Sequence, residues 1–524
     1  MNAQSTRVAV IGNGPVGQTA ALLLARWGVP VVVLDQRPER DPTGSRSICQ
    51  QGDVLDVWAS VGAGQRIADE GVTWTTARTF YRDRELFSHT FRDPGHAHFP
   101  PFVNISQART EQILDERIAA DPLIDVRWGH EVTGLEQDSG GVRLRCGTEV
   151  VDADYAVACA GAHGDRVRRM LGVRFEGHTF DDRFLICDIR TDLPDWASER
   201  RFYFDPAWNP GRQVLIHPCP DSTFRIDWQI PPGFDLDAES ASGALDARIR
   251  AIIGDRDYEV RWKSVYRFHS RLVDRMVVGR VLIAGDCAHL LAPFGARGLN
   301  SGVADAENAA WKLAFVLHGW AGPELLASYQ DERHPAAQEN LAVTAATMEF
   351  LVPHGEEQRR RRLRALEGAV TDPAARAEVN SGRLSEPFWY VDSPLSTPDT
   401  TRPFAGRPPR GSAPPAAPGI LVPDVPVPTP GSTRIRELAR NGFLLLAAES
   451  SDVAASQDVA NNFPFPTRVF LIPDLDTTGA LTTALNAKPG EVWVIRPDAH
   501  IAAVLHNPGR ADITAALERA LGKA

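Results

Sequence analysis

The sequence contains few cysteines, and their positions exclude two common kinds of site. Six cysteines are spread over 524 residues, with no CxxC pair and no spacing typical of metal ligands. Reduced, mostly buried thiols are therefore expected, and no metal site is predicted. No cysteine follows Cys287, so the rest of the chain cannot perform dithiol chemistry.

Positive charge is also scarce relative to negative charge. Lys and Arg number 56 against 67 Asp and Glu, giving a formal net charge of -11, with a pI near 5.7. Nucleic acids and anionic membrane surfaces are bound mainly by clustered Lys and Arg, so neither is expected as a partner. The single basic run, Arg359–Leu366, has a mixed-charge helical pattern and is interpreted as a solvated helix face.

Long apolar runs are missing as well. The N-terminal segment 7–34 is the most apolar, but its glycines, Arg26 and Trp27 interrupt it. No stretch approaches the roughly 20 apolar residues of a membrane-spanning helix. With 43% hydrophobic residues, the chain can bury a large core over several domains. We therefore expect a soluble, cytoplasmic protein.

The N-terminal segment has the pattern of a dinucleotide-binding βαβ unit. "RVAVIGNGPVGQTAALLLARWG" predicts a strand, a GxGxxG turn and a helix, and "VPVVVLDQR" predicts a second strand that ends in Asp35. Such glycines let backbone N–H groups approach a pyrophosphate, and a carboxylate at that strand end accepts hydrogen bonds from a ribose. NAD and FAD share this unit, so the motif alone leaves the nucleotide open.

A second glycine-rich segment lies near the middle of the chain. A strand is predicted over Val281–Ala284, with Gly285 and Asp286 at its carboxyl end, where open α/β sheets bind ligands. "PFGARGLNSG" then opens a long helix whose apolar positions include Leu313. The helix N-terminus directs partial positive charge at a ligand, and Asp286 can accept a ribose or ribityl hydroxyl.

The order of these motifs resembles that of the group A flavoprotein monooxygenases, the single-component FAD-dependent aromatic hydroxylases. Members close to p-hydroxybenzoate hydroxylase, 3-(3-hydroxyphenyl)propionate hydroxylase and phenol 2-monooxygenase carry GxGxxG, a "DG" motif and a "GD…P…G…G…N…D" motif in this order. The similarity extends from Arg7 to about Pro335. It implies an α/β protein: a Rossmann-like FAD-binding domain with an inserted β-sheet substrate domain, followed by a thioredoxin-like domain.

The resemblance also implies the cofactor site. The glycines of the first motif would hold the FAD pyrophosphate, Asp35 the adenosine ribose and Asp286 the ribityl hydroxyls. Arg46 would lie near the FAD phosphates and the nicotinamide coenzyme, and Gln107 near the flavin chain. The full implied set is Gly12, Gly14, Pro15, Val16, Gly17, Asp35, Gln36, Arg37, Arg46, Gln107, Gly161, Gly285, Asp286, Pro293, Gly295, Gly298, Leu299 and Asn300.

The chain departs from the family at the second motif. It has Ala160 where the family has aspartate, in "VACAGAHGDRVRRMLG". In the family this motif serves both FAD and the nicotinamide coenzyme. Two interpretations stay open: Asp165 substitutes from one turn later, or Arg166 and Arg168 cap a helix.

The middle of the chain is expected to hold the substrate. Short alternating strands are predicted between about Phe175 and Tyr266, and alternation places Arg225, Asp227 and Gln229 on one face of the last strand, with Phe224, Ile226 and Trp228 on the other. By resemblance, Arg225 matches an arginine that pairs with a substrate carboxylate. The alternative is an Arg–Asp pair on a solvated sheet face.

Further candidate catalytic residues follow from chemistry and from the resemblance. His217 and Tyr203 could orient or deprotonate a phenol. Pro293 would face the substrate beside the isoalloxazine ring, and His289 is expected to be structural.

The resemblance, with shifts in composition along the chain, implies five parts. They are a first FAD-binding part (1–175), a β-sheet substrate domain (176–270), a second FAD-binding part with long helices (271–385), a Pro-rich connection (386–430) and a thioredoxin-like domain without CxxC (431–524). The last is expected to be structural or to form a homodimer.

The resemblance implies that NADPH or NADH reduces FAD, which reacts with O2 to a C4a-hydroperoxide that hydroxylates a small phenolic substrate. Hydroxylation or Baeyer–Villiger oxidation of a larger polyketide-like substrate uses the same motifs. A flavin-binding protein without turnover is the third possibility, given Ala160.

Overall fold

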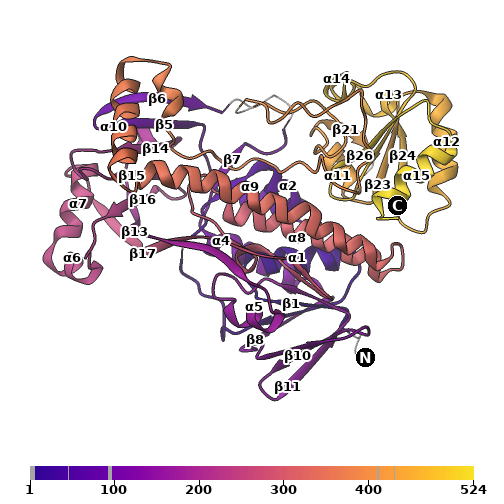
Figure 1. The fold of residues 1–524 in the computed structure, drawn as a ribbon, viewed down its shortest axis with the longest axis horizontal. Helices are drawn as coiled ribbons and strands as arrows, with labels where there is room; N and C mark the ends of the chain where they lie inside the picture. Colours follow the sequence, from indigo (N-terminus) through magenta and orange to yellow (C-terminus); the bar gives the residue numbers. More distant parts are fainter. Residues whose placement is uncertain (1–5, 45, 92–96, 410–411, 430, 524) are drawn as a thin grey trace.

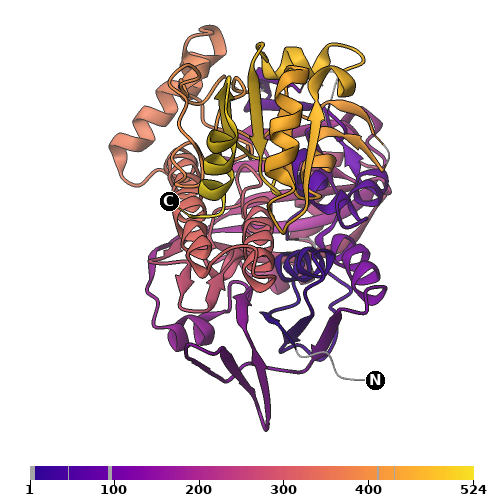
Figure 2. The ribbon, with the colours of Figure 1, turned by 90° about the vertical axis from the view of Figure 1, so that its right-hand side faces the viewer.

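The computed structural model describes residues 6–44, 46–91, 97–409, 412–429 and 431–523. Figures 1 and 2 show two sheet-containing layers joined by long helices, with a smaller domain at the C-terminus. No helix among these residues is both long and apolar enough to cross a membrane.

A six-stranded sheet forms the first layer. Its order is β18-β19-β12-β1-β2-β8, and every pair is parallel except β18–β19. The strands are β1 (Val8–Ile11), β2 (Val31–Asp35), β8 (Ile124–Trp128), β12 (Tyr155–Ala158), β18 (Val277–Val278) and β19 (Val281–Ile283). The central strands are buried on both faces, as expected for a parallel sheet between helices.

Helices α1 (Pro15–Arg26), α4 (Gln107–Ala119), α5 (Asp165–Leu171) and α8 (Gly298–Leu317) pack around this sheet. Helix α1 begins with proline at its first position, which suits a residue without an N–H. A Cβ at Gly17 would lie 1.9 Å from the Gly12 carbonyl oxygen, so only glycine lets α1 pack against the turn. The Rossmann-like arrangement expected from the sequence is confirmed.

An eight-stranded sheet forms the second layer. Its order is β20-β17-β13-β16-β15-β14-β5-β6. The strands are β5 (Thr76–Tyr81), β6 (Arg84–Thr90), β13 (Phe175–Thr191), β14 (Glu199–Phe204), β15 (Gln213–Cys219), β16 (Thr223–Ile230), β17 (Tyr258–Val273) and β20 (His289–Leu290). Because β5 pairs with β14 and β20 with β17, this sheet extends beyond the predicted segment 176–270 at both ends.

The two faces of this sheet have different partners. Helices α6 (Leu236–Ser242) and α7 (Ala244–Ile253) cover the outer face, where Phe224, Ile226 and Trp228 pack. The inner face packs its phenylalanines against Ala292 and Phe294, in the loop before α8, and against α9 (Ala327–Leu351) and α10 (Glu356–Thr371). The alternation predicted for Phe224 to Gln229, on β16, is therefore confirmed.

Smaller elements complete the main body. They are β3 (Cys49–Gln51), β4 (Val72–Thr73), β7 (Phe102–Asn104), β9 (Gly134–Gln137), β10 (Val142–Cys146), β11 (Glu149–Ala153), α2 (Gly52–Ala59) and α3 (Gly64–Glu70). The basic run lies on α10, with Arg359, Arg360, Arg361 and Arg364 exposed, as predicted for a solvated helix face.

The C-terminal domain contains a mixed four-stranded sheet of order β24-β23-β25-β26. Its elements are β21 (Pro426–Thr429), β22 (Ser432–Arg434), α11 (Ile435–Ala439), β23 (Phe443–Ala447), α12 (Ser450–Ala460), β24 (Thr467–Leu471), α13 (Ile472–Leu475), α14 (Ala480–Leu485), β25 (Glu491–Ile495), β26 (Ile501–His506) and α15 (Arg510–Ala520). This matches the expected thioredoxin-like layout. Trp311 and Phe315 of α8 enter its core, so the domain is packed onto the main body (Figure 1).

Candidate functional site

A cavity of about 590 Å³ lies at the carboxyl ends of β1, β2, β12 and β19. Most of the predicted cofactor residues line it: Gly12, Gly14, Pro15, Val16, Asp35, Gln36, Arg37, Arg46, Gln107, Gly161, Asp286 and Leu299. A larger, more open hollow of about 790 Å³ beside β10 and β11 is lined by none of the predicted residues. The motifs therefore converge on the smaller cavity.

The glycines of the first turn have different tasks. Gly12 has φ +107°, and a Cβ there would lie 2.4 Å from the Cys159 carbonyl oxygen, so this glycine packs against β12. At Gly14 a Cβ would meet no protein atom within 4 Å. Gly14 is also the N-cap of α1, whose first residues Pro15 and Val16 line the cavity. An anion can therefore approach this turn closely.

Asp35 ends β2 at the cavity wall. Its carboxylate accepts hydrogen bonds from the Asn13 N–H at 2.7 Å and from the Arg37 guanidinium at 2.9 and 3.0 Å. Burial raises the pKa of Asp35, but the bonds from Arg37 and Asn13 outweigh it and the net pKa lies below its usual value. The carboxylate is therefore ionised and also holds the glycine turn in place.

Asp286 points into the same cavity from the end of β19. Its side chain is exposed to the open cavity, and within the described part of the chain no protein group donates a hydrogen bond to its carboxylate. Its position deep among protein atoms raises its pKa, which His289, Arg46 and Arg168 only partly oppose. A carboxyl group that faces a cavity without a protein donor is suited to accept bonds from ligand hydroxyls.

Arg46 and Gln107 lie at the cavity mouth. Arg46 Nε donates to the Tyr266 hydroxyl at 3.1 Å, and Gln107 Oε1 accepts from the Ser47 N–H at 3.3 Å. Gln107 Nε2 donates to Glu111 at 2.8 Å. Both predicted side chains are thus held at the mouth by neighbouring residues.

The divergent second motif is arranged differently from either prediction. Ala160 lines the cavity, whereas Asp165 begins α5, is exposed and pairs with Arg168 at 2.5 Å. Asp165 does not replace the missing carboxylate in the cavity wall. Arg168 is buried and donates to the Cys287 and Ala162 carbonyls at 3.2 and 3.1 Å, so it joins the second motif to Gly285-Asp286 instead of capping its helix.

The loop before α8 lies beyond this cavity. Gly17, Gly285, Pro293, Gly295, Gly298 and Asn300 are not among the residues that line it. The Asn300 amide is occupied: Oδ1 accepts from the Gln51 N–H at 3.0 Å, and Nδ2 donates to the Cys49 and Ala296 carbonyls. Asn300 therefore fastens the loop to β3. Pro293 is exposed, whereas neighbouring Phe294 is buried against the inner sheet face.

A buried polar cluster occupies that inner face. His217 and Arg225 are cross-strand neighbours, and Arg225 Nε donates to Asp227 Oδ1 at 2.9 Å. Arg225 Nη1 donates to the Arg46 carbonyl at 2.9 Å, which links the cluster to the cavity mouth. The Arg–Asp pair predicted as an alternative exists, but Arg225 is only 4% exposed, so the pair is not solvated.

His217 has an unused ring nitrogen. Its Nδ1 is buried and has no hydrogen-bond partner among the described residues, and its Nε2 lies 3.9 Å from Asp227 Oδ2. Burial, then Arg200 and Arg225, hold the pKa of His217 well below its usual value. The imidazole is therefore neutral at neutral pH.

Tyr203 does not join this cluster. Its ring stacks on Phe80 at 4.5 Å and packs against Trp208 at 5.4 Å, on the outer side of β14. Phe202, its neighbour on the inner side, packs near Phe294, as Phe184 and Phe268 do. Strand alternation thus turns Tyr203 away from the loop before α8 and from His217, so its predicted role in orienting a phenol stays a prediction without support from its position.

Sequence reasoning missed three cavity residues on β17. Trp262, Ser264 and Tyr266 line the mouth opposite Arg46. Their spacing of two residues is the signal that places them on one strand face. Which face meets the cavity depends on how the two sheets pack, and no local pattern reveals that.

Comparison with known proteins now bears on this geometry. The family model described as "FAD binding domain" matches residues 5–344. The chain belongs to this FAD-binding family. The match spans both glycine-rich motifs and the inserted sheet, which are the parts that form the cavity.

Individual relatives extend the comparison. A 3-(3-hydroxy-phenyl)propionate/3-hydroxycinnamic acid hydroxylase 2 of Burkholderia vietnamiensis (strain G4 / LMG 22486) is 31% identical over 361 residues, 66% of this chain and 64% of that protein. The alignment thus spans less than two thirds of that relative. A 3-(3-hydroxy-phenyl)propionate/3-hydroxycinnamic acid hydroxylase of Mycobacterium sp. (strain KMS) is 26% identical over 520 residues, 95% of this chain and 88% of that protein.

Solved structures show the same fold along the whole chain. The flavin-dependent monooxygenase PieE, crystallised with FAD and substrate, superposes with a TM-score of 0.85 at 23% identity and covers 100% of both chains. At this identity the likeness establishes the fold.

The residues around the cavity fit FAD. An open helix N-terminus at Gly14 suits a pyrophosphate, and the carboxyl groups of Asp35 and Asp286 suit ribose and ribityl hydroxyls. No group of three or more potential metal ligands occurs among the described residues.

Proposed function

We propose that this protein is an FAD-dependent monooxygenase that hydroxylates a phenolic ring with O2 and NADH or NADPH. The observation that carries the proposal is the unused, buried Nδ1 of neutral His217, on the sheet face that packs against the loop before α8. The hydroxylase names of two relatives point to the same chemistry.

In this proposal the cavity holds FAD along its length. The pyrophosphate lies over Gly12, Gly14, Pro15 and Val16, with Gly17 as the packing residue that keeps the turn in shape. Asp35, Gln36 and Arg37 hold the adenosine end, and Asp286 binds the ribityl hydroxyls. Arg46 and Gln107 would contact FAD at the cavity mouth and Gly161 along the wall, and the remaining motif residues, Pro293 to Asn300 with Gly285, would shape the isoalloxazine end beyond the cavity.

Bound FAD supplies the electron transfer from NAD(P)H and the activation of O2. The chain's own part is to hold and ionise the phenol. We propose that His217 Nδ1 accepts the phenol proton and that Asp227 stabilises the imidazolium formed. Arg225 neutralises the resulting phenolate or a substrate carboxylate. Arg225 is buried and His217 and Asp227 are mostly covered, which limits the access of water to the reacting groups.

The proton transfer can be tested with a matched pair of variants. His217→Gln should lower kcat/KM for a phenol by about 100-fold, the usual contribution of a general base. Tyr203→Phe on the outer face is the control and should leave kcat/KM within about twofold. An acidic phenol, such as a nitrophenol that is already ionised at the assay pH, should rescue His217→Gln. Equal losses for acidic and ordinary phenols would remove His217 as the base.

The reaction itself is tested by anaerobic flavin reduction with NADH and NADPH. A panel of phenols, with and without carboxylates, and of polycyclic polyketide-like phenols should contain a class that accelerates reduction. Acceleration by polycyclic compounds alone would assign the larger substrate class. No reduction under any condition would instead support a flavin-binding protein without turnover, with Ala160 as the reason.

A further inference from the structure

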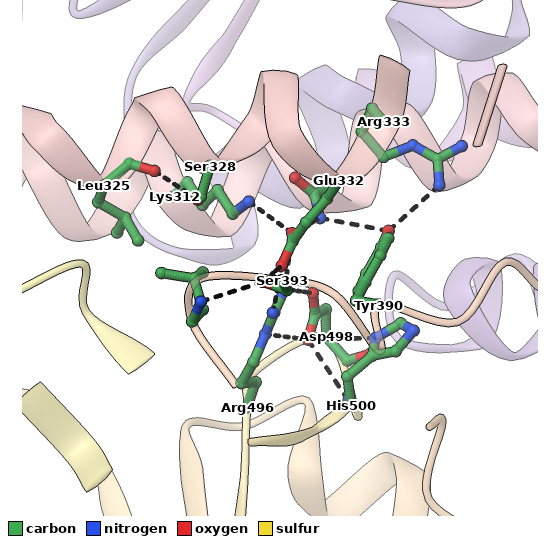
Figure 3. A network of polar contacts seen from close by, with 12 residues as sticks. Lys312, Leu325, Ser328, Glu332, Arg333, Tyr390, Ser393, Arg496, Asp498 and His500 are labelled. Carbon is green, nitrogen blue, oxygen red and sulfur yellow. Dashed lines mark hydrogen bonds and ion pairs between the residues drawn. The ribbon is translucent and has the colours of Figure 1, made fainter. Parts of the chain in front are cut away.

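Several arginines of the C-terminal domain bind the main body: Arg436 pairs with Asp53 and Asp56, Arg440 with Glu307, and the fully buried Arg496 with Glu332. Arg496 follows β25 and donates to both Glu332 carboxylate oxygens on α9, at 2.5 and 3.0 Å (Figure 3). It also donates to Asp498 at 2.6 and 3.1 Å. Its guanidinium carbon lies 5.3 Å from the ring centres of Trp311 and Tyr390. A planar fork bound in this way is fixed in orientation.

Glu332 connects this guanidinium to the two long helices. Besides Arg496, it accepts hydrogen bonds from Lys312 Nζ and Asn308 Nδ2 on α8, both at 2.7 Å, and from Ser393 Oγ at 2.5 Å. Burial alone would raise the pKa of Glu332, but Arg496 and Lys312 hold it well below its usual range. An ionised carboxylate thus binds α8, α9 and the C-terminal domain together.

The neighbouring residue on α9 continues the network toward the cofactor cavity. Arg333 Nε donates to Asp305 Oδ1 at 2.7 Å, and Nη2 donates to the Ser301 carbonyl at 3.1 Å. The Tyr390 hydroxyl accepts from Arg333 Nη1 at 3.2 Å and from Asn308 Nδ2 at 3.3 Å. Tyr390 therefore joins the Glu332 cluster to Arg333 (Figure 3).

The network ends on the backbone that carries the cofactor carboxylate. Asp305 Oδ2 accepts from the Gly285 N–H at 3.0 Å and from His289 Nε2 at 2.7 Å. Gly285 has φ +60° and directly precedes Asp286. An unbroken series of buried hydrogen bonds thus runs from Arg496 to the N–H of Gly285, the residue before Asp286.

We propose that Arg496, acting through Tyr390, is a positioning residue of the C-terminal domain that holds Gly285-Asp286 in the geometry that binds FAD. The inference goes beyond the proposed reaction, because it concerns FAD binding alone and holds whatever the substrate is. It assigns the thioredoxin-like domain, which lacks cysteines, a part in building the cofactor site.

The test is titration of FAD into the apo-protein. Arg496→Met should raise the Kd for FAD about tenfold, within the range of couplings carried by buried networks. Arg496→Lys, which keeps the charge without the fork, should restore part of the affinity. Arg402→Met is the matched control: Arg402 binds Glu491 through two bonds of 2.8 and 3.0 Å and lies over Trp493, all within the C-terminal part.

A purely structural role predicts a different result. In that case Arg496→Met and Arg402→Met would both lower the melting temperature, and both would leave the Kd for FAD at the wild-type value. That result would overturn the proposal. Tyr390→Phe removes one hydroxyl and keeps the ring, so it tests the relay even if Arg496→Met does not fold. The relay predicts that it weakens FAD binding several-fold, and that the double variant loses less than the product of the single losses. An unchanged Kd in Tyr390→Phe contradicts the relay.

Discussion

Replacing Gly14 with alanine should separate cofactor binding from folding. The backbone there has φ -85° and ψ 178°, which alanine adopts freely. No protein atom lies within 4 Å of the added Cβ. Alanine reduces the entropy of the unfolded chain, worth about 0.4–1 kcal/mol, and loses a comparable amount as a poorer helix N-cap. The stability of the apo-protein should therefore change by less than about 0.5 kcal/mol.

FAD binding should respond strongly to the same methyl group. If the pyrophosphate contacts the backbone at Gly14, the Cβ intrudes on it and costs about 1–3 kcal/mol, as overpacking does in protein cores. The Kd for FAD should then rise by roughly 5- to 150-fold. Gly12→Ala is the contrasting variant, since its Cβ would lie 2.4 Å from the Cys159 carbonyl oxygen at φ +107°. That variant should lose apo stability as well.

Two measurements on each variant decide the matter: the melting temperature of the apo-protein and fluorescence titration with FAD. The predicted pattern is an unchanged melting temperature with weakened binding for Gly14→Ala, and loss of both for Gly12→Ala. Wild-type affinity in Gly14→Ala would refute the placement of the pyrophosphate over this turn.

Three further predictions concern the titratable side chains of Asp286, Asp305 and His217. Asp286→Asn should raise the Kd for FAD at least about tenfold, because a hydrogen bond to a charged group contributes about 1.5–3 kcal/mol; unchanged titration curves would contradict this. Burial raises the pKa of Asp305, but Arg333 and His289 bring it down to about 2 from 3.8. Ionised Asp305 should therefore stabilise the fold above about pH 4, and the free energy of unfolding should fall by about 2 kcal/mol as the pH is lowered to 2. Urea unfolding at several pH values should show a smaller fall in Asp305→Asn. Because the pKa of His217 lies well below 6.5, kcat/KM for a phenol should show no loss from imidazole protonation between pH 6 and 8. If kcat/KM instead falls below about pH 6.5, and His217→Gln abolishes this fall, then the pKa of His217 is not lowered and the prediction is wrong.

Local patterns carried most of the fold. The signals for fully apolar strands, for glycine turns and for a proline at the start of α1 each lie within a few residues of sequence. The βαβ unit and β19 could therefore be predicted. The pairing of β5 with β14 could not, because it joins segments more than 100 residues apart and leaves no period in the sequence. For this reason the second sheet is larger than predicted.

In the candidate site, too, the residues in local motifs could be predicted, whereas those whose position depends on packing between layers could not. Gly12, Gly14, Asp35 and Asp286 lie in motifs with a direct physical reason for each residue, and all four line one cavity. Sequence reasoning groups Tyr203 with His217 because the two lie on neighbouring strands, yet they lie on opposite faces of the sheet. Alternation defines two faces of a strand, but only packing between layers decides which of them meets the site.

The central claim, hydroxylation of a phenol with O2, is tested most directly by turnover under 18O2 with NAD(P)H and mass analysis of the product. The account predicts that one 18O atom enters the ring of each product molecule for each NAD(P)H oxidised. A phenol recovered without 18O, with the NAD(P)H consumed appearing as hydrogen peroxide for every compound tried, would contradict it.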